Sequence, residues 1–571
     1  MIEHDVADVC VVGLGASGGT IAAALATAGL QVVGLEAGPD HDPARSATEF
    51  DADEIAAIVD RRYMWSEPEV LVYDGGAPMV FNWLPRNIGV GGPLHWSGFS
   101  YRYHPSDFRI ASEQGVPADS SVADWPVSYN ELEPFYEEAE QLLNVAGAWQ
   151  QHPYDPPRRA DYPMPPVPST GRAEMLADAA RAIGWHPYRQ PAAVRTVPGT
   201  EPHVHDCNGC GHCTFFACGR NAKGSTLVSV LPPARATGNL DVRAECLATE
   251  VTVDSGGRPN GVRYRDARGD AHEQPAHTIV LALNAPYVAR LLLLSTSPHH
   301  RRGLGNVADQ VGRHATFHTS TMAYGVFDDV MLHAERGPQV QVGVDDFNEH
   351  RPWDAGAPFR RGGVLNAGMP AAFAGGPLSF ATALGDWVPL PDGVPPYGDE
   401  YLRFAAHAYP RHVAVFGLGE DLPRPENRVT IDPDVVDSAG LPAIRITFTP
   451  HDEDRASAQY LLERSMEWLD AAGADVVLGA VPPLPGGIRA GHAHGTTRMG
   501  TSPDTSVADS VGLVHGFDNL FVAGAGLFVT SAGYNPCLTI VALALRAAGA
   551  IAEIAANNSA RTGTFTERLV S

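Results

Sequence analysis

The chain has 571 residues, 44% hydrophobic and 19% charged, which is enough to bury the cores of several domains. Its formal net charge of −26 would repel a phosphate backbone or an anionic membrane surface, so we exclude nucleic-acid binding. Seven cysteines are too few for a small disulfide scaffold. No basic, apolar leader opens the chain, and no uncharged apolar run reaches the ~20 residues of a membrane helix. We therefore expect a cytoplasmic protein without a membrane span.

The N-terminal segment predicts a βαβ unit that holds a dinucleotide. A buried strand over residues 9–12 leads through a glycine turn into an alanine-rich helix over 20–28 and a second strand over 31–35. The turn fits G-x-G-x-x-G, which lets a pyrophosphate approach the backbone and the helix N-terminus. Its candidate cofactor-binding residues are Gly13, Gly15, Ala16, Ser17 and Gly18. Glu36 closes the second strand and suits a ribose hydroxyl, which disfavours NADP but leaves FAD and NAD open.

The next part of the chain is mixed in character. A loop rich in Gly and Trp over residues 83–98 precedes an acidic helix over 129–143 and a proline-rich connector over 153–168. Four cysteines then fall close together between residues 207 and 218. Short strands between residues 240 and 282 indicate a return to the cofactor domain.

The second half of the chain predicts a separate domain followed by a last return. From about residue 315 to 488, strands broken by Pro and Gly accompany one amphipathic helix over 454–471. Residues 491–555 hold glycine-rich loops, a strand and a long Ala/Leu helix. Because that helix contains Arg546 and Glu553, we interpret it as a buried core helix rather than a membrane span.

The C-terminal segment carries the most specific pattern. It reads GHAHGTTRMG from residue 491, VAD from 507, DNLFVAGAG from 518 and TSAGYNPCLTI from 530. This combination closely resembles the C-terminal signature of the glucose–methanol–choline (GMC) flavoprotein oxidoreductases. The N-terminal unit, the 89–92 loop and the Asp-Trp-Pro stretch from residue 124 follow in matching order, so the resemblance covers nearly the whole chain. Within that family, the chain most resembles the sugar branch of the gluconate 2-dehydrogenase flavoprotein and the pyranose-oxidase-like enzymes. Three features carry this resemblance: the WPVSY stretch from 125, the four-cysteine loop and the Asn535-Pro536 pair.

The resemblance implies an α/β fold. A discontinuous Rossmann-like FAD-binding domain would accompany an α+β substrate domain that contains an antiparallel sheet. We assign to the FAD-binding domain residues 1–45, 85–130, 203–314 and 490–560. The substrate-binding domain and its connectors would take residues 131–202 and 315–489.

The resemblance also implies the chemistry, which is oxidation of a carbinol to a carbonyl with FAD as hydride acceptor. Hydride leaves only as the hydroxyl proton is removed, so a base with a pKa near neutrality is expected, and imidazole is the usual choice. The family motif H-x-x-G-T places that base at His492, with His494 as its main rival. Asn535 cannot take a proton, so we expect it to hold the substrate oxygen and orient the alcohol.

Further cofactor contacts come from the same resemblance, at Gly91, Gly92, His95, Trp96, Val251, Gly524, Ala525, Asn535 and Pro536. Some members attach the flavin covalently through a histidine in the loop that holds His95. The spacing here is one residue shorter than in those members, so we expect non-covalent FAD. Val251 matches a position whose backbone meets the adenine.

The cysteine loop is open to three interpretations. Its spacing, C-x2-C-x2-C-x4-C, could place an iron–sulfur cluster on Cys207, Cys210, Cys213 and Cys218, as on a comparable loop of some bacterial relatives. Structural zinc is the second possibility, although the usual second CxxC pair is missing. We favour the third, a compact turn of thiols or disulfides. Lys223, the chain's one lysine, lies in the same loop and could pair an acid, reach the FAD phosphates or be solvated.

The expected substrate is a small sugar, glycoside or polyol. A polar substrate pocket is favoured by Arg360, Arg361 and the tryptophans at 353 and 387. The alternatives are a steroid or aliphatic alcohol oxidase, a flavin electron-transfer subunit and, without net redox, a hydroxynitrile lyase. Oxygen, a quinone or a cytochrome could accept the electrons, and a small helper subunit or a homo-oligomer is compatible with the resemblance.

Overall fold

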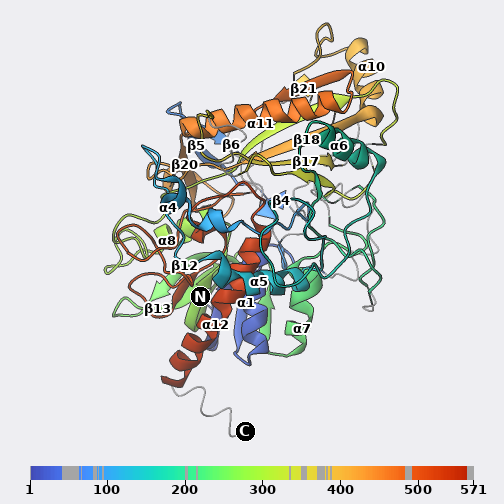
Figure 1. The fold of residues 1–571 in the computed structure, drawn as a ribbon. Helices are drawn as coiled ribbons and strands as arrows, with labels where there is room; N and C mark the ends of the chain where they lie inside the picture. Colours follow the sequence, from blue (N-terminus) through green and yellow to red (C-terminus); the bar gives the residue numbers. More distant parts are fainter. Residues whose placement is uncertain are drawn as a thin grey trace.

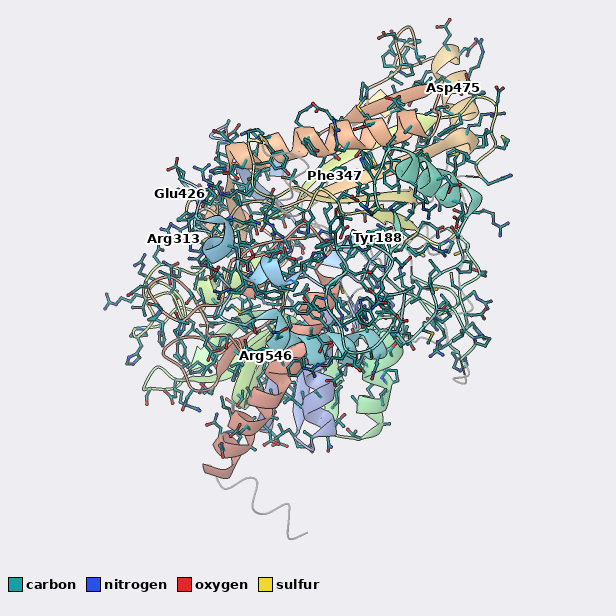
Figure 2. The ribbon with its side chains drawn as sticks, in the orientation of Figure 1. Tyr188, Arg313, Phe347, Glu426, Asp475 and Arg546 are labelled. Carbon is teal, nitrogen blue, oxygen red and sulfur yellow. The ribbon has the colours of Figure 1, made fainter. Side chains whose placement is uncertain are left out.

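A computed structural model describes residues 2–41, 64–65, 67–81, 86–87, 89–92, 96–199, 203–211, 213, 217–333, 336–348, 356–369, 380, 384–385, 389–482 and 492–561. Its helices and two largest sheets form two layered bodies, one above the other in Figure 1. Side chains fill the space between these layers, with Tyr188 and Phe347 in the upper body and Arg546 on the long helix of the lower one (Figure 2).

The lower body is built on an eight-stranded sheet. Its strands are β1 (Ile2–Glu3), β2 (Ala7–Val12), β3 (Val32–Leu35), β11 (Leu240–Arg243), β12 (Leu247–Val253), β13 (Pro259–Arg265), β14 (Ala271–Leu281) and β22 (Leu520–Val522). The order β11-β3-β2-β14 is parallel throughout, and β22 joins β14 in parallel as well. Every residue of β2 and β3 is buried, as expected for parallel strands covered on both faces.

Helices cover this sheet. They are α1 (Ala16–Thr27), α5 (Tyr129–Leu142), α7 (Leu231–Ala236), α8 (Ala285–Leu294) and α12 (Cys537–Arg561). Helix α12 packs on α1, α5, β2 and β14, while α1 also packs on α7 (Figure 1). The predicted βαβ unit and the predicted acidic and C-terminal helices are therefore present within a few residues of their expected bounds.

The upper body holds an antiparallel six-stranded sheet. In spatial order its strands are β21 (Val476–Ala480), β15 (Thr319–Val326), β18 (His412–Gly419), β17 (Gly363–Met369), β16 (Val342–Val344) and β9 (Tyr188–Arg189). Helices α11 (Asp452–Ala471) and α6 (Gly171–Ala182) pack on it and on each other. The predicted α/β class with an antiparallel substrate-side sheet is confirmed, whereas the domain boundaries stay a prediction.

Smaller elements complete the described chain. A four-stranded sheet consists of β19 (Arg428–Val436), β20 (Pro442–Phe448), β5 (Glu69–Tyr73) and β6 (Met79–Phe81). Two strand pairs are β8 (Val145–Ala146) with β10 (Ala192–Ala193), and β4 (Met64–Trp65) with β7 (Arg86–Asn87). The short helices are α4 (Ile110–Gln114), α10 (Asp399–Ala408), the 3₁₀ turns η1 (Pro105–Phe108), η4 (Tyr409–Arg411) and η5 (Ala525–Leu527), and the π-helical turn η2 (Thr226–Val230).

Helix α12 is the one described helix whose length and composition would allow it to cross a membrane, over Cys537–Asn558. Half of that window (50%) is buried inside the protein, against the helices and strands named above. The packing matches the expectation of a core helix.

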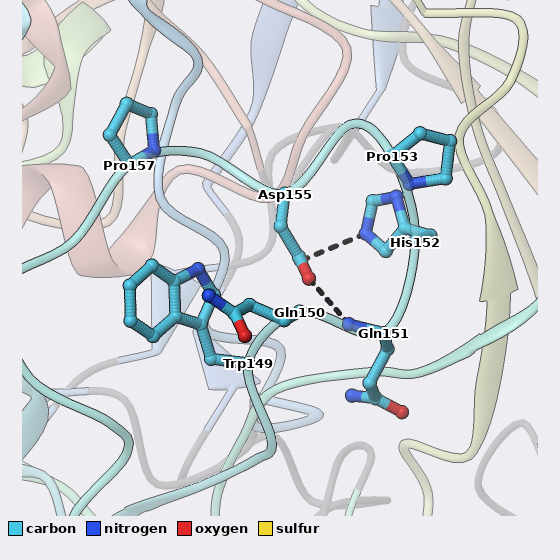
Figure 3. A pocket seen from close by; sticks show the side chains of 7 residues that line it. All are labelled: Trp149, Gln150, Gln151, His152, Pro153, Asp155 and Pro157. Carbon is cyan, nitrogen blue, oxygen red and sulfur yellow. Dashed lines mark hydrogen bonds and ion pairs between the residues drawn. The ribbon is translucent and has the colours of Figure 1, made fainter.

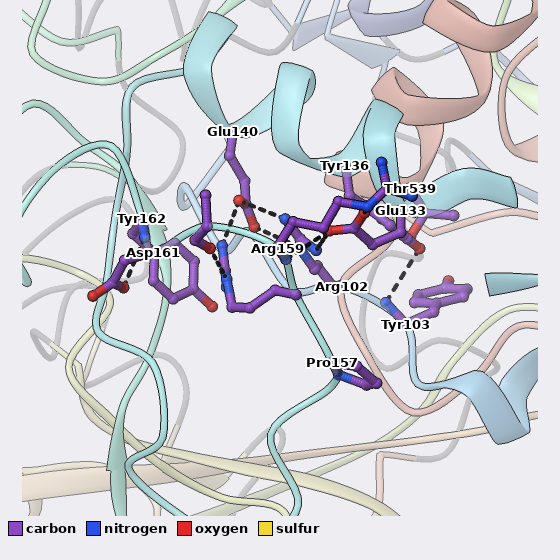
Figure 4. A network of polar contacts seen from close by, with 12 residues as sticks. Arg102, Tyr103, Glu133, Tyr136, Glu140, Pro157, Arg159, Asp161, Tyr162 and Thr539 are labelled. Carbon is purple, nitrogen blue, oxygen red and sulfur yellow. Dashed lines mark hydrogen bonds and ion pairs between the residues drawn. The ribbon is translucent and has the colours of Figure 1, made fainter. Parts of the chain in front are cut away.

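A buried ionic network fastens α5 to the rest of the molecule (Figure 4). The Arg102 guanidinium donates to both carboxylate oxygens of Glu140, at 2.8 and 2.9 Å, and to Glu133 at 3.2 Å. Arg158 donates to the same Glu140 carboxylate. The side chains of Arg102 and Glu140 are at most 1% exposed, so these charges depend on each other rather than on water.

Candidate active site

The predicted glycine turn sits at the carboxyl end of β2. Gly13 has φ +88°, and a Cβ there would lie 2.9 Å from the Ala282 carbonyl oxygen. A Cβ on Gly18 would lie 1.8 Å from the Gly13 carbonyl oxygen. Both positions therefore exclude a side chain, and the turn delivers the backbone to the N-terminus of α1 as the motif predicts.

A second glycine loop closes over the first. The Gly91 N–H donates to the Leu14 carbonyl at 2.9 Å, and Gly92 has φ +49°. A Cβ on Gly92 would lie 2.5 Å from the Gly15 Cα, so the two loops touch backbone to backbone. The structure thus brings together the two predicted glycine segments. Beside them the Ser17 hydroxyl is buried and has no hydrogen-bond partner among the described residues.

The C-terminal strand reaches the same edge. Strand β22 pairs with β14 in parallel, and the chain then turns at Gly524, which has φ +91°. A Cβ on Gly524 would lie 3.8 Å from the Ser17 Cβ, and the Ala525 carbonyl accepts the Gly495 N–H at 3.1 Å. Parallel strands end at one edge, so these residues line the crevice where open α/β sheets bind ligands.

The Glu36 carboxylate, predicted to bind a ribose hydroxyl, also accepts hydrogen bonds from backbone N–H groups of the protein. It accepts the N–H groups of Leu14 and Gly38, each at 2.9 Å, and that of Gly89 at 3.4 Å. Burial raises the pKa of Glu36, while the bonds from Gly38 and Leu14 lower it. Glu36 therefore joins both glycine loops; its contact with a ribose stays a prediction.

Val251 lies in β12, where its N–H donates to the Ser295 hydroxyl at 2.9 Å. A contact between this N–H and an adenine would have to displace Ser295, so the predicted adenine contact would more readily use another backbone atom of Val251. The predicted role itself is untested.

The loop after Gly92 is described only in part. His95 lies outside the described residues, whereas the Trp96 indole N–H donates to the Gly224 carbonyl at 3.1 Å. Lys223 is buried and its ammonium donates to the carbonyls of Trp96 and Cys213, at 2.9 and 2.6 Å. The alternative of a solvated lysine is therefore wrong, because Lys223 joins the Trp96 loop to the cysteine loop.

The four cysteines of the cysteine loop are free thiols. Within the described ranges, no group of three or more His, Cys, Asp or Glu is arranged to hold a metal ion. Burial raises the pKa of Cys213 to about 12, with Lys223 lowering it. Cys213 is therefore a protonated thiol, and the cluster, zinc and compact-turn interpretations of the loop stay predictions.

His492 forms a pair with a histidine that the sequence did not single out. Its Nδ1 lies 2.9 Å from the Nδ1 of His318, the residue that precedes β15. The other nitrogen of His318, Nε2, lies 3.1 Å from the Ser531 carbonyl oxygen. Because Ser531 belongs to the loop that leads to Asn535, His318 connects the two predicted catalytic segments.

Burial, together with the nearby His318, lowers the pKa of His492 to about 3. The expectation of a pKa near neutrality is therefore wrong. Among the described residues, this imidazole is hydrogen-bonded to another buried imidazole rather than to a carboxylate, so no negative charge offsets its loss of hydration. His492 is neutral at physiological pH and can accept a proton.

Asn535 and His494 both carry buried polar atoms that need a partner. The Asn535 Oδ1 and both ring nitrogens of His494 have no hydrogen bond in the part of the chain that the structure describes. The His494 ring is fully buried and stacks on Phe528, with ring centroids 5.2 Å apart. Unpartnered buried polar atoms are rare and point to a missing ligand, which fits Asn535 as an orienting group.

Two buried carboxyls lie behind the same loop. Glu420 accepts the Ala532 N–H at 3.2 Å, and the Asp421 N–H donates to the Ser531 hydroxyl at 3.1 Å. Burial raises the pKa of Glu420 to about 7, against the lowering effect of Arg361. Burial also raises the pKa of Asp421 to about 7.

A pocket of about 600 Å³ opens beside the segment that follows β8 (Figure 3). It is lined by Trp149, Gln150, Gln151, His152, Pro153, Asp155 and Pro157. The His152 ring bridges Asp155, at 2.9 Å, and Asp345, at 3.3 Å. Asp345 in turn accepts the Tyr534 hydroxyl at 2.9 Å, and Tyr534 precedes Asn535. A polar chain thus connects the pocket with the Asn535 loop.

The arginines expected to mark a polar pocket are occupied elsewhere. Arg361 is buried between Asp107 and Glu420, and Arg360 pairs with Glu453. The tryptophans at 353 and 387 lie outside the described residues. Among the described residues, a pocket with polar side chains lies instead beside Trp149.

A glycine cradle at the carboxyl edge of a parallel sheet defines a dinucleotide-binding protein. Residues 171–320 and 423–544 match the N-terminal and C-terminal models of the GMC oxidoreductases. The chain is 29% identical to the gluconate 2-dehydrogenase flavoprotein of Pantoea cypripedii, over 96% of its own length and 93% of the relative. It is 31% identical to the 2-methyl-1,2-propanediol dehydrogenase of Mycolicibacterium austroafricanum, over 95% and 94%.

Among solved structures, pyridoxine 4-oxidase from Mesorbium loti has a similar fold, with a TM-score of 0.61 at 18% identity over 95% of this chain and 99% of that one. The chain belongs to the GMC oxidoreductase family and is an oxidoreductase. The family predicted from the C-terminal signature is confirmed.

Proposed function

We propose that this enzyme oxidises a carbinol of a sugar, glycoside or polyol to a carbonyl, with His492 as proton acceptor and Asn535 orienting the alcohol. The observation that carries the proposal is the partly buried, neutral His492, which is joined through His318 to the loop of Asn535, whose Oδ1 has no partner among the described residues. Support for the substrate class comes from the pocket beside Trp149, because its Trp, Gln and Asp side chains are those that hydroxyl-rich ligands use.

We propose non-covalent FAD as the cofactor. The residues present fit its pyrophosphate, because Gly92 leaves no room for a side chain against the Gly15 backbone and the buried Ser17 hydroxyl, beside the N-terminus of α1, has no partner among the described residues. When bound, FAD supplies the hydride acceptor at its N5. The chain's own residues hold the alcohol and remove the hydroxyl proton: the Asn535 amide binds the oxygen, and the neutral His492 takes the proton.

The test of this function is the absorption spectrum of the purified protein, followed by anaerobic addition of sugars, glycosides and polyols. A flavin spectrum that one of these compounds bleaches supports the proposal and excludes a lyase without net redox. Bleaching by a steroid or aliphatic alcohol alone would favour the apolar-alcohol alternative. A protein without flavin would contradict the proposal.

Asn535→Ala is expected to lower kcat/KM for the alcohol by about 10- to 100-fold, because one hydrogen bond to the reacting oxygen is lost. Flavin content should stay close to that of the wild type. Steady-state kinetics with the best substrate of the panel, normalised to flavin absorbance, checks this prediction. An unchanged kcat/KM would remove Asn535 from the site.

Titration of His492 should not make kcat/KM depend on pH between about pH 5 and pH 8, because its lowered pKa keeps the imidazole unprotonated above about pH 4. Protonation below that range would abolish its proton-accepting role. The measurement is kcat/KM against pH for the wild type, Glu420→Gln and Asp421→Asn. A limb near pH 7 that vanishes in either variant belongs to that carboxyl, whereas a limb near 6.5 that persists in both would contradict the prediction.

A further inference from the structure

His318 and His492 face each other because of backbone pairing. Thr316 and His494 form an antiparallel bridge, with the Thr316 N–H on the His494 carbonyl at 3.2 Å and the reverse bond at 2.9 Å. In an antiparallel register, a step of two residues along each strand brings residue 318 opposite residue 492 on the same face. The ring centroids of these two histidines are 4.9 Å apart. The contact is therefore built into the backbone.

The hydrogen bonds of this pair determine where each proton lies. A carbonyl oxygen only accepts, so the contact with Ser531 requires a proton on the Nε2 of His318. Burial lowers the pKa of His318 to about 4, against the raising effect of the Ser531 and Ala532 carbonyls. The ring is thus neutral, and its Nδ1 carries a lone pair. The opposite tautomer would set a lone pair against the Ser531 oxygen.

A lone pair on the Nδ1 of His318 requires a donor on the other side of the 2.9 Å contact. The Nδ1 of His492 must therefore carry its proton, and neutral imidazole then leaves Nε2 bare. The Nε2 of His492 makes no hydrogen bond with any residue that the structure describes.

We propose that His318 is a positioning residue that fixes the tautomer of His492, so that Nε2 of His492 is the atom that accepts the substrate's hydroxyl proton. This inference rests on the proposed function of His492 and adds the partner and the atom. After the transfer, His492 carries protons on both nitrogens, and its Nδ1–H still donates to His318. The same contact thus serves the neutral and the protonated ring, without a carboxylate.

The first test reads the tautomer directly, without turnover. The protein as purified is labelled with ¹⁵N-histidine, and the signals of residue 492 are assigned by comparison with His492→Ala. We expect a protonated Nδ1 and a bare Nε2. A protonated Nε2 at neutral pH would overturn the proposal even if His492 proves essential. If the tautomers are as expected but the enzyme oxidises no alcohol, the pairing of His318 with His492 is supported and the proposed function is contradicted.

The second test separates positioning from structure. His318→Phe keeps a ring but removes the acceptor, so kcat should fall about 10- to 100-fold with KM nearly unchanged. His318→Gln offers an amide oxygen to His492 and an amide N–H to the Ser531 carbonyl, and should restore most of kcat. Flavin absorbance per chain verifies that both variants are loaded. A kcat for His318→Phe within about twofold of wild type, or equal losses in the two loaded variants, would overturn the proposal.

Discussion

Replacing His492 by alanine is expected to lower kcat by about 100- to 10,000-fold, the range that a positioned general base contributes. The expectation depends on two features of the imidazole. Burial keeps it neutral, with its pKa lowered to about 3, and the contact with His318 holds it in one orientation. The measurement is single-turnover flavin reduction with the best substrate.

Two matched variants make this result interpretable. His494→Ala tests the rival base on the same segment, and His299→Ala removes an exposed histidine from the loop after α8. His299→Ala should be indistinguishable from the wild type. If His494→Ala abolishes flavin reduction while His492→Ala leaves it intact, the assignment of the base is wrong. Flavin content per chain shows whether any loss comes from failed assembly.

The parts of the site that depend on local geometry could be predicted from the sequence. Gly13 and Gly18 belong to a turn whose backbone tolerates no Cβ, so the spacing of the glycines alone predicts this turn. The same holds for the turn at Gly524, which follows a short buried strand. Motifs of this kind can be predicted because the contacts that require their residues lie within about a dozen residues of sequence.

The parts that depend on contacts between distant segments could not be predicted in this way. His318 meets His492 only because Thr316 pairs with His494, and no local pattern announces that pairing. The partners of Lys223 could not be predicted either, because the two carbonyls that accept its hydrogen bonds belong to another loop and to an irregular turn. The pKa of His492 also escaped prediction, because it is set by burial and by a neighbour from outside the motif.

The largest expected effect on stability comes from Glu140 rather than from the active site. Glu140→Ala should lower the free energy of unfolding by about 3–5 kcal/mol, the usual cost of removing one partner from a buried ion pair. The carboxylate accepts three bonds, two from Arg102 (Figure 4) and one from Arg158. Without it, the Arg102 guanidinium keeps only its bonds to Glu133 and Tyr129, in a site that water does not reach.

The control is Glu138→Ala, which removes an exposed carboxylate from the same helix and should leave stability unchanged within about 0.5 kcal/mol. Urea unfolding followed by tryptophan fluorescence, at equal flavin loading, compares the two variants with the wild type. The network joins α5 to Arg102, and Tyr103, the next residue, donates its hydroxyl to the Ser531 carbonyl at 2.7 Å. Loosening at Glu140 should therefore also weaken the support of the Ser531 loop, so that kcat falls with stability in Glu140→Ala. Equal midpoints for the two variants would mean that the buried charges of α5 are solvated in solution.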